Sequence, residues 1–175
     1  MEKQKNTKKP AVFLDRDGVL TEEKGYILDV KNLRIFSYVA ECVRIIHEKG
    51  YYAIVITNQS GVGRGMFTEE TLWEMNDVLV KHTGVDAVYY CPHHPDAGCC
   101  CRKPKTGLFE MACRDFGIDL ERSYMVGDRA GDILAGQNAG VKTILVESGY
   151  GTTGLEMEVA PNYICEDLTE VLGVI

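Results

Sequence analysis

The chain has 175 residues, 45% of them hydrophobic and 26% charged, which is enough for the buried core of one globular domain. Its net charge of −7 argues against a general affinity for polyanions such as nucleic acids. No apolar run approaches the roughly 18 residues of a membrane span, and no apolar segment follows the lysine-rich N-terminus as in a secretory signal. We therefore expect a cytoplasmic monomer with no nucleic-acid or membrane partner, a disordered or extended tail over residues 1–10, and a single domain over residues 11–175.

Short apolar runs alternate with helical periodicity along the chain. The predicted strands cover residues 11–14, 52–57, 86–90, 124–126, 143–146 and a short stretch near 163. The predicted helices cover residues 37–49, a segment beginning at the N-cap Thr68, 107–116, 132–139 and a closing helix near 175. This alternation predicts an α/β domain with a doubly wound, mainly parallel sheet. Since ligands of such domains bind at the carboxyl ends of the strands, polar residues just after the strands are the candidate site.

Two carboxylates follow the first predicted strand. Asp15 and Asp17 are two residues apart, so in an extended chain they point to the same side, and Gly18 allows a sharp turn after them. Paired carboxylates attract a cation, and Mg²⁺ prefers oxygen ligands of this kind. This segment alone also fits an ordinary turn, with Arg16 paired to a surface acid, or a calcium loop.

The second predicted strand ends in Thr57, and an Asn-Gln-Ser-Gly segment follows. Hydroxyl, amide and backbone N–H groups of such a loop can hold phosphate oxygens. The glycines at 61, 63 and 65 do not form a dinucleotide fingerprint, because the next helix begins only near Thr68. They predict a flexible loop in which Arg64 is exposed, with contact between Arg64 and the substrate as the alternative.

Four of the seven cysteines lie between residues 91 and 101. A Cys-x-His pair, a spacer of five residues and a Cys-x-Cys pair predict a tetrahedral Zn²⁺ site. The chosen ligands are Cys91, His93, Cys99 and Cys101, with His94 and Cys100 as competing candidates. Four protein ligands leave no open position, so this zinc would be structural. A group of unbound thiols is a poor alternative for four cysteines in eleven residues.

The later candidate site residues follow the cysteine-rich residues 91–101, called the zinc segment below, and the fourth predicted strand. Lys103 could neutralise both a phosphate and a nucleophile, and Asp128 could complete a magnesium site with Asp15 and Asp17. Asp132 falls in the first turn of a helix, where an acid is favoured whatever its function. We expect Asp132 to have a supporting role at most.

Taken in order, these residues resemble the four motifs of the haloacid dehalogenase (HAD) superfamily of phosphohydrolases. The matching segments are Asp15-Arg16-Asp17-Gly18, Thr57-Asn58, Lys103 and Gly127-Asp128-x-x-x-Asp132. The pair Gly25-Tyr26, the Tyr-Tyr-Cys-Pro-His-His segment and the Cys-Arg-Lys-Pro segment are similar to D-glycero-D-manno-heptose 1,7-bisphosphate 7-phosphatases. This resemblance implies a Rossmann-like HAD fold without a cap domain and supports the chosen zinc ligands. The spacer between His93 and Cys99 is shorter than in many members, which leaves the sugar and its anomer open.

The resemblance also implies roles for single residues. Asp15 would be the nucleophile, Asp17 the general acid and base, and Thr57 and Lys103 would hold the phosphoryl group. Mg²⁺ would be held by Asp15, the Asp17 carbonyl and Asp128. The implied substrate contacts are Arg16, Glu23, Lys24, Gly25, Tyr26, Asn58, Gln59, Ser60 and Arg102.

Several functions remain open at this point. The first is a phosphatase of heptose bisphosphate, and Arg102 beside the catalytic lysine would suit a second phosphate. The second is a histidinol-phosphate phosphatase or a phosphatase of another small sugar phosphate. A zinc-stabilised binding module would hydrolyse no phosphate ester, and a DNA 3′-phosphatase is disfavoured by the acidic charge.

Overall fold

The computed structural model describes residues 8–155 and 159–175. Its centre is a six-stranded sheet in the order β3-β2-β1-β4-β5-β6, and every neighbouring pair is parallel. The strands are β1 (Ala11–Leu14), β2 (Tyr52–Asn58), β3 (Ala87–Cys91), β4 (Tyr124–Gly127), β5 (Lys142–Val146) and β6 (Tyr163–Cys165). The predicted doubly wound parallel sheet is confirmed.

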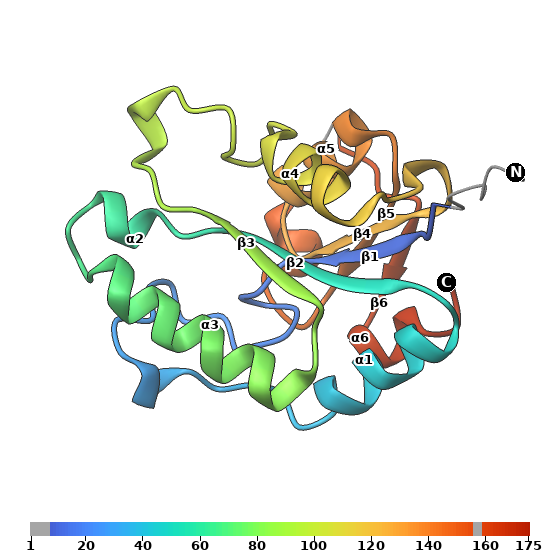
Figure 1. Ribbon diagram of the computed structural model, residues 1–175, viewed down its shortest axis with the longest axis horizontal. Coiled ribbons are helices and arrows are strands. Elements are labelled where there is room, and N and C mark those ends of the chain that lie inside the picture. The colour runs from blue at the N-terminus through green and yellow to red at the C-terminus, as the bar shows by residue number, and fades with distance from the viewer. Residues whose placement is uncertain (1–7, 156–158) are drawn as a thin grey trace, which may run out of the picture.

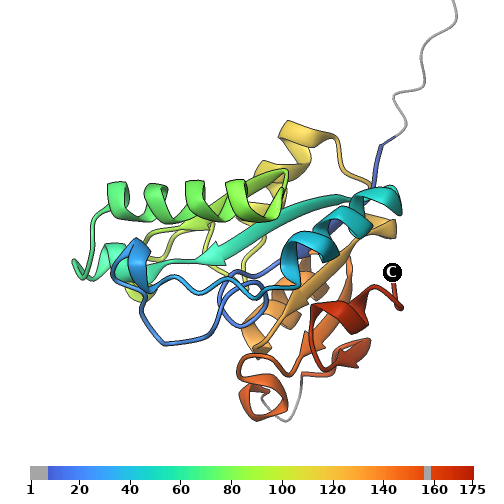
Figure 2. The same ribbon diagram turned by 90° about the horizontal axis from the view of Figure 1, so that it is seen from below.

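Helices cover both faces of the sheet (Figures 1 and 2). On one face lie α1 (Val39–Glu48), α3 (Glu69–Thr83) and α6 (Leu168–Val171). On the other lie α4 (Gly107–Phe116) and α5 (Ala130–Ala139). The short α2 (Ser60–Gly63) follows β2, and 3-10 turns lie at Val30–Asn32, Pro95–Ala97, Leu120–Arg122 and Gly151–Gly154.

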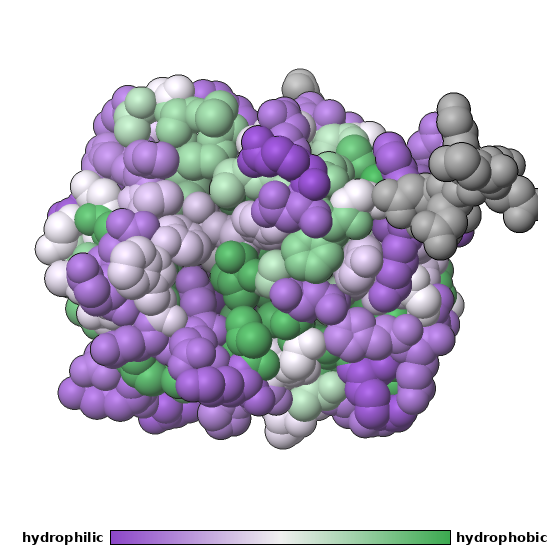
Figure 3. Space-filling view, viewed as in Figure 1, coloured by the Kyte–Doolittle hydropathy of each residue, from purple (hydrophilic) through white to green (hydrophobic). Residues whose placement is uncertain are grey.

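The central strand β1 shows how the sequence builds this layering. Val12 and Leu14 point into the core under α1 and α6, whereas Ala11 and Phe13 point into the core under α4 and α5. All four residues are completely buried, as expected for a strand covered on both faces. The edge strand β3 is only half-buried over its first four residues. Figure 3 shows hydrophobic side chains near this edge, on a face that is otherwise largely hydrophilic.

Two predictions about local structure need correction. The glycine segment after β2 is not wholly a flexible loop, because residues 60–63 form α2, which rests on the zinc segment through a Gly63 N–H···O=C Pro92 bond of 2.8 Å. Helix α5 begins at Ala130, two residues before the predicted start. Arg64 is exposed, as predicted.

The predicted N-terminal tail, residues 1–10, lies only partly within the residues that the structure describes. Residues 1–7 lie outside them. The Pro10 carbonyl accepts a hydrogen bond from the Tyr52 N–H at 2.9 Å, so the line of β1 extends back to this residue. No helix within residues 8–155 and 159–175 is both long enough and apolar enough to cross a bilayer.

Candidate active site

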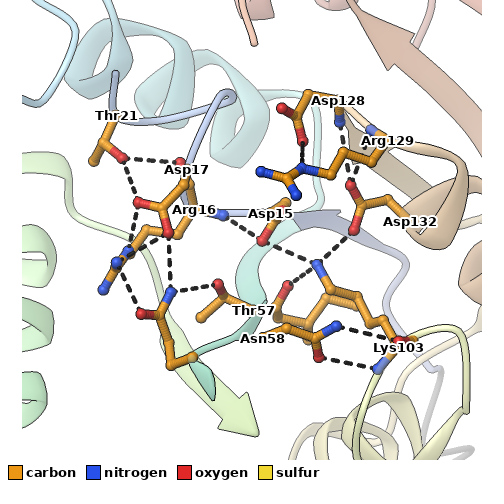
Figure 4. A network of polar contacts seen from close by, with 12 residues as sticks. Asp15, Arg16, Asp17, Thr21, Thr57, Asn58, Lys103, Asp128, Arg129 and Asp132 are labelled. Atoms are coloured by element: carbon orange, nitrogen blue, oxygen red, sulfur yellow. Dashed lines mark hydrogen bonds and ion pairs between the residues drawn. The ribbon is translucent and has the colours of Figure 1, made fainter. Parts of the chain in front are cut away.

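A cleft of about 400 Å³ lies at the carboxyl ends of β1, β2 and β4. Ten of the predicted site residues line it: Asp15, Asp17, Glu23, Gly25, Tyr26, Thr57, Asn58, Ser60, Arg102 and Lys103. Figure 4 shows how side chains from separate segments converge there. The parallel sheet therefore brings together residues that are far apart in the sequence, as the strand-end rule predicts.

Lys103 lies at the base of this cleft, with its ammonium group buried. The Nζ atom lies 2.9 Å from Asp15 Oδ1 and 2.7 Å from Asp132 Oδ1, and it donates a hydrogen bond of 2.8 Å to the Ile56 carbonyl. Burial by itself would lower the pKa of Lys103, but the charges of Asp132 and Asp15 outweigh it and raise this pKa. Lys103 is therefore held as a cation beside the candidate nucleophile.

Burial also acts on Asp15. Burial has the largest effect on the pKa of Asp15 and raises it, as do the charges of Asp132 and Asp17, whereas the charge of Lys103 lowers it. The net result is a pKa of about 6 for Asp15. A carboxylate in this environment is poorly solvated, which favours both a bound cation and reaction with an electrophile.

The carboxylate of Asp17 faces a buried polar network. Arg16 binds it through two nitrogens at 3.0 and 2.9 Å, and Thr21 Oγ1 and Gln59 Nε2 each donate a hydrogen bond of 3.0 Å. Burial alone would raise the pKa of Asp17, but Arg16, Gln59 and Thr21 lower it below its usual value. The network fixes the orientation of Asp17 in the absence of substrate.

Three predicted substrate contacts lie outside the lining of the cleft. The side chains of Arg16 and Gln59 are buried behind Asp17 and hold it in place. The exposed Lys24 pairs with Glu22 and borders a neighbouring hollow of about 610 Å³. Sequence spacing could not reveal these orientations, because each depends on a partner contact.

Asp128 completes a cluster of three carboxylates. One oxygen of each of Asp15, Asp128 and Asp132 lies within 4.8 Å of the others. Asp128 Oδ2 accepts a hydrogen bond of 2.9 Å from the Tyr150 N–H, but the buried Oδ1 has no hydrogen-bond partner in the described part of the chain. Burial, followed by the charges of Asp15 and Asp132, raises the pKa of Asp128 to about 7. Asp128 Oδ1 accepts no hydrogen bond from the described residues and has only a 3.9 Å contact with Arg129 Nε, so within this cluster of like charges it is suited to bind Mg²⁺.

Asp132 is more deeply involved than the sequence indicated. Its Oδ1 pairs with Lys103, while its Oδ2 accepts the N–H groups of Asp128 and Arg129 at 3.2 Å and so caps α5. One carboxylate therefore joins the lysine to the loop that carries Asp128. The three residues that separate Asp132 from Asp128 were a sequence signal for this role, but an acidic residue at that position also fits an ordinary helix start.

The zinc segment brings together Cys91, His93, Cys99 and Cys101, the four predicted ligands, with one potential ligand atom of each within 4.8 Å of the others. The distance from Cys91 Sγ is 3.5 Å both to His93 Nδ1 and to Cys99 Sγ, and the distance from His93 Nδ1 to Cys101 Sγ is 3.2 Å. Tetrahedral bonding to one zinc requires separations of about 3.5–3.8 Å, which two of these pairs meet, while the 3.2 Å pair would have to open slightly. The donor types and their convergence fit Zn²⁺.

The competing zinc candidates lie differently. The Nδ1 atom of His94 accepts a hydrogen bond of 3.3 Å from the Asp96 N–H, and Cys100 is exposed. The segment is also tied to β2, because the Cys91 carbonyl accepts a hydrogen bond of 2.8 Å from the Gln59 N–H. A metal here would therefore stabilise the wall of the cleft.

Sequence reasoning missed four residues of the cleft lining, Pro95, Arg129, Gly131 and Tyr150, and the exposed Arg64 lines the cleft as well. The Nη2 atom of Arg129 lies 2.8 Å from Glu23 Oε2, and the guanidinium carbon of Arg129 is 3.8 Å from the centre of the Tyr150 ring. Arg129 directly follows Asp128, and Tyr150 follows a strand. Applying the strand-end rule to β5 would have found Tyr150.

Comparison with known proteins reveals close relatives. A family model described as HAD-hydrolase-like matches residues 100–171. The D-glycero-beta-D-manno-heptose-1,7-bisphosphate 7-phosphatase of Haemophilus ducreyi is 38% identical and the match covers 94% of this chain and 97% of that relative. The protein of the same name from Vibrio cholerae is 44% identical, over 83% of this chain and 85% of that relative. The chain belongs to this HAD-like phosphatase family.

Membership of this phosphatase family makes the chain a hydrolase, as the motifs predicted. A crystal structure of D,D-heptose 1,7-bisphosphate phosphatase from B. bronchiseptica, complexed with magnesium and phosphate, has a TM-score of 0.85 and 31% sequence identity. The match covers 94% of this chain and 97% of that one. The Rossmann-like HAD fold expected of the phosphatase is therefore confirmed.

Proposed function

We propose that this phosphatase removes the 7-phosphate of D-glycero-β-D-manno-heptose 1,7-bisphosphate in a Mg²⁺-dependent reaction. The observation that carries the proposal is the charge arrangement of one cleft, which has Asp15 and Lys103 at its base and three arginines, Arg64, Arg102 and Arg129, in its lining. Arg129 is paired with Glu23, whereas Arg64 and Arg102 form no ion pair within the part of the chain that the structure describes. Arg102 has a buried guanidinium nitrogen with no partner among the described residues. Two cationic regions in one cleft suit a substrate with two phosphates. The names of the relatives support the β-anomer.

The reaction begins at Asp15. A carboxylate oxygen of Asp15 forms a bond to phosphorus as the bond between phosphorus and the sugar oxygen breaks, which gives an aspartyl-phosphate. Thr57 and Lys103 bind the phosphoryl oxygens, where negative charge develops. Lys103 is already fixed beside Asp15, so little reorganisation is needed.

Asp17 handles the protons. It donates a proton to the leaving sugar oxygen, then accepts one from the water that hydrolyses the aspartyl-phosphate. The hydrogen bonds from Arg16, Gln59 and Thr21 favour its ionised form before substrate binds. The negative charge of the entering phosphate has the opposite effect and raises the pKa of Asp17 toward the value that a general acid requires.

The chain has two donor sets that fit metals. Asp15, the Asp17 carbonyl and Asp128 would hold Mg²⁺, which when bound offsets repulsion between the nucleophile and the phosphate. The cluster of Cys91, His93, Cys99 and Cys101 would hold a structural Zn²⁺. We further infer a monomeric cytoplasmic enzyme with one catalytic domain over residues 11–175 and a small sugar phosphate as its only partner.

Histidinol phosphate is the second candidate substrate. Its cationic amine would need an acidic subsite, but the acidic lining residue Glu23 is already neutralised by Arg129. This contact supports a bisphosphate over histidinol phosphate.

The test is the rate of phosphate release with Mg²⁺ from four compounds: the β- and α-anomers of D-glycero-D-manno-heptose 1,7-bisphosphate, histidinol phosphate and p-nitrophenyl phosphate. The β-anomer is expected to have the highest kcat/KM. A higher kcat/KM for histidinol phosphate would overturn the substrate assignment. Absence of turnover for all four compounds would overturn the phosphatase proposal itself.

A further inference from the structure

Asn58, at the end of β2, binds the main chain of Lys103 from 45 positions away in the sequence. Its Oδ1 accepts a hydrogen bond of 3.0 Å from the Lys103 N–H, and its Nδ2 donates one of 3.1 Å to the Lys103 carbonyl (Figure 4). The amide thus pairs with both polar groups of one residue, as a neighbouring strand would.

This pairing matters because Lys103 belongs to no helix or strand. It lies between the turn at Pro95–Ala97 and α4, which begins at Gly107. No ladder of regular hydrogen bonds therefore fixes where its main chain lies along the cleft. The Asn58 amide provides this missing constraint.

The side-chain ammonium and the main chain of Lys103 are both hydrogen-bonded to β2. The Ile56 carbonyl accepts a hydrogen bond from Nζ at 2.8 Å, and two residues further on Asn58 binds the main chain. With its main chain fixed, the side chain places Nζ 2.9 Å from Asp15 Oδ1. A small displacement of the main chain would move the ammonium away from the nucleophile.

We propose that Asn58 is a positioning residue, which acts on phosphoryl transfer by fixing the main chain of Lys103. The resemblance implied a direct substrate contact instead. Here the amide oxygen already accepts one hydrogen bond from Lys103 and one of the two N–H groups donates to it, which leaves one N–H and one oxygen lone pair for any other partner. The inference rests on the proposed role of Lys103 in binding the phosphoryl group.

The test compares Asn58→Ala with wild type on the heptose bisphosphate and on p-nitrophenyl phosphate, which has no sugar hydroxyls. If Asn58 acts through Lys103, kcat falls about 10- to 100-fold by the same factor on both substrates, because the misplaced lysine affects the phosphoryl group common to both. KM for the sugar changes little. A loss confined to the sugar substrate and to its KM would mean a direct sugar contact and would overturn the proposal.

A double-mutant cycle gives the second readout. Binding of orthovanadate to metal-loaded protein, measured by calorimetry, needs no turnover, so it also serves variants with no measurable activity. Asn58→Ala is expected to weaken vanadate binding in wild type and to have no further effect in the Lys103→Ala background. Additive losses would overturn the proposal. If either alanine variant fails to fold, Asn58→Ser and Lys103→Gln replace them.

A matched control is available in Asn138. Its Nδ2 donates a hydrogen bond of 3.0 Å to the Pro104 carbonyl, one residue further along the same loop, and it is an exposed contact. Asn138→Ala is expected to keep kcat within about twofold of wild type. An equal loss in the two variants would mean that general loosening of the loop, not placement of Lys103, is responsible. Failure of wild type to hydrolyse either ester would instead count against the proposed function.

Discussion

Lys103 and Asp132 form a buried ion pair, with the Lys103 Nζ 2.7 Å from Asp132 Oδ1. Both side chains are almost completely removed from solvent, so each needs the charge of the other. The same carboxylate caps α5 through its second oxygen. The pair therefore contributes to stability and to placement of the lysine.

Asp132→Asn is expected to lower both the free energy of unfolding and kcat. The amide removes one of the two charges that stabilise the ammonium, and its NH2 group must face either Lys103 or the N–H groups that Asp132 now caps. Removal of one partner of a buried pair typically costs about 3 kcal/mol. Urea unfolding measures this loss. The control is Asp167→Asn, since asparagine caps α6 as well as aspartate does. Equal unfolding free energies in the two variants would contradict the expectation.

Gly149→Ala is expected to weaken Mg²⁺ binding. A Cβ at this position would lie 2.1 Å from Asp128 Oδ2, so the carboxylate would have to move. We expect the Mg²⁺ concentration for half-maximal activity to rise about tenfold or more, with partial recovery at saturating Mg²⁺. In the control Gly173→Ala, the new Cβ would lie 3.4 Å from the Glu170 carbonyl oxygen, which is an ordinary contact. An unchanged Mg²⁺ requirement in Gly149→Ala would show that Asp128 is not a ligand.

Asp15→Asn is expected to abolish turnover without unfolding the protein. An amide is a poor nucleophile and a weaker ligand for Mg²⁺, so kcat should fall by about 10³-fold or more. Phosphate release and circular dichroism measure the two properties. Asp29→Asn, which alters a partly exposed carboxylate outside the cleft, should retain wild-type activity. Turnover near the wild-type rate in Asp15→Asn would rule out the aspartyl-phosphate.

The zinc segment allows a comparison of adjacent cysteines. Cys99→Ser removes a residue of the four-membered cluster, whereas Cys100→Ser changes an exposed thiol beside it. We expect Cys99→Ser to lose zinc and to lower Tm by about 5 °C or more, and Cys100→Ser to keep both at wild-type values. Elemental analysis and thermal unfolding provide the measurements. Purified wild type without zinc would refute the assignment.

The stability of protein freed of Mg²⁺ should depend on pH. The pKa values of Asp15 and Asp128 are raised to about 6 and about 7, above their usual value near 4. Between about pH 4 and pH 7 the folded state therefore binds more protons than the unfolded state, so the stability from these two groups decreases as pH rises through this range.

Since Mg²⁺ binds only the ionised carboxylates, the rise in Tm that it causes should be larger at pH 8 than at pH 5. Thermal unfolding of desalted protein with and without Mg²⁺ tests both statements. Asp128→Asn should lose most of the pH dependence of this Mg²⁺ effect. An equal Mg²⁺ effect at the two pH values in wild type would contradict the expectation.

Local sequence patterns predicted most of the fold. Strand and helix positions were predicted to within a few residues, because apolar periodicity and capping residues are properties of neighbouring positions. The strand-end rule then predicted that Asp15, Thr57 and Asp128 would meet. The short α2 escaped prediction because its glycines give no helical signal, and its position depends on contact with the zinc segment.

The orientation of side chains within the site depended on the tertiary structure. The sequence alone indicated carboxylates, a lysine and a cysteine-histidine cluster, with the spacing of motifs found in phosphatases. It could not show that Arg16 is buried behind Asp17, that Asp132 binds Lys103, or that Asn58 pairs with the main chain of Lys103. Each of these facts depends on which partner a polar group meets once water is excluded, and those partners come from other strands and loops.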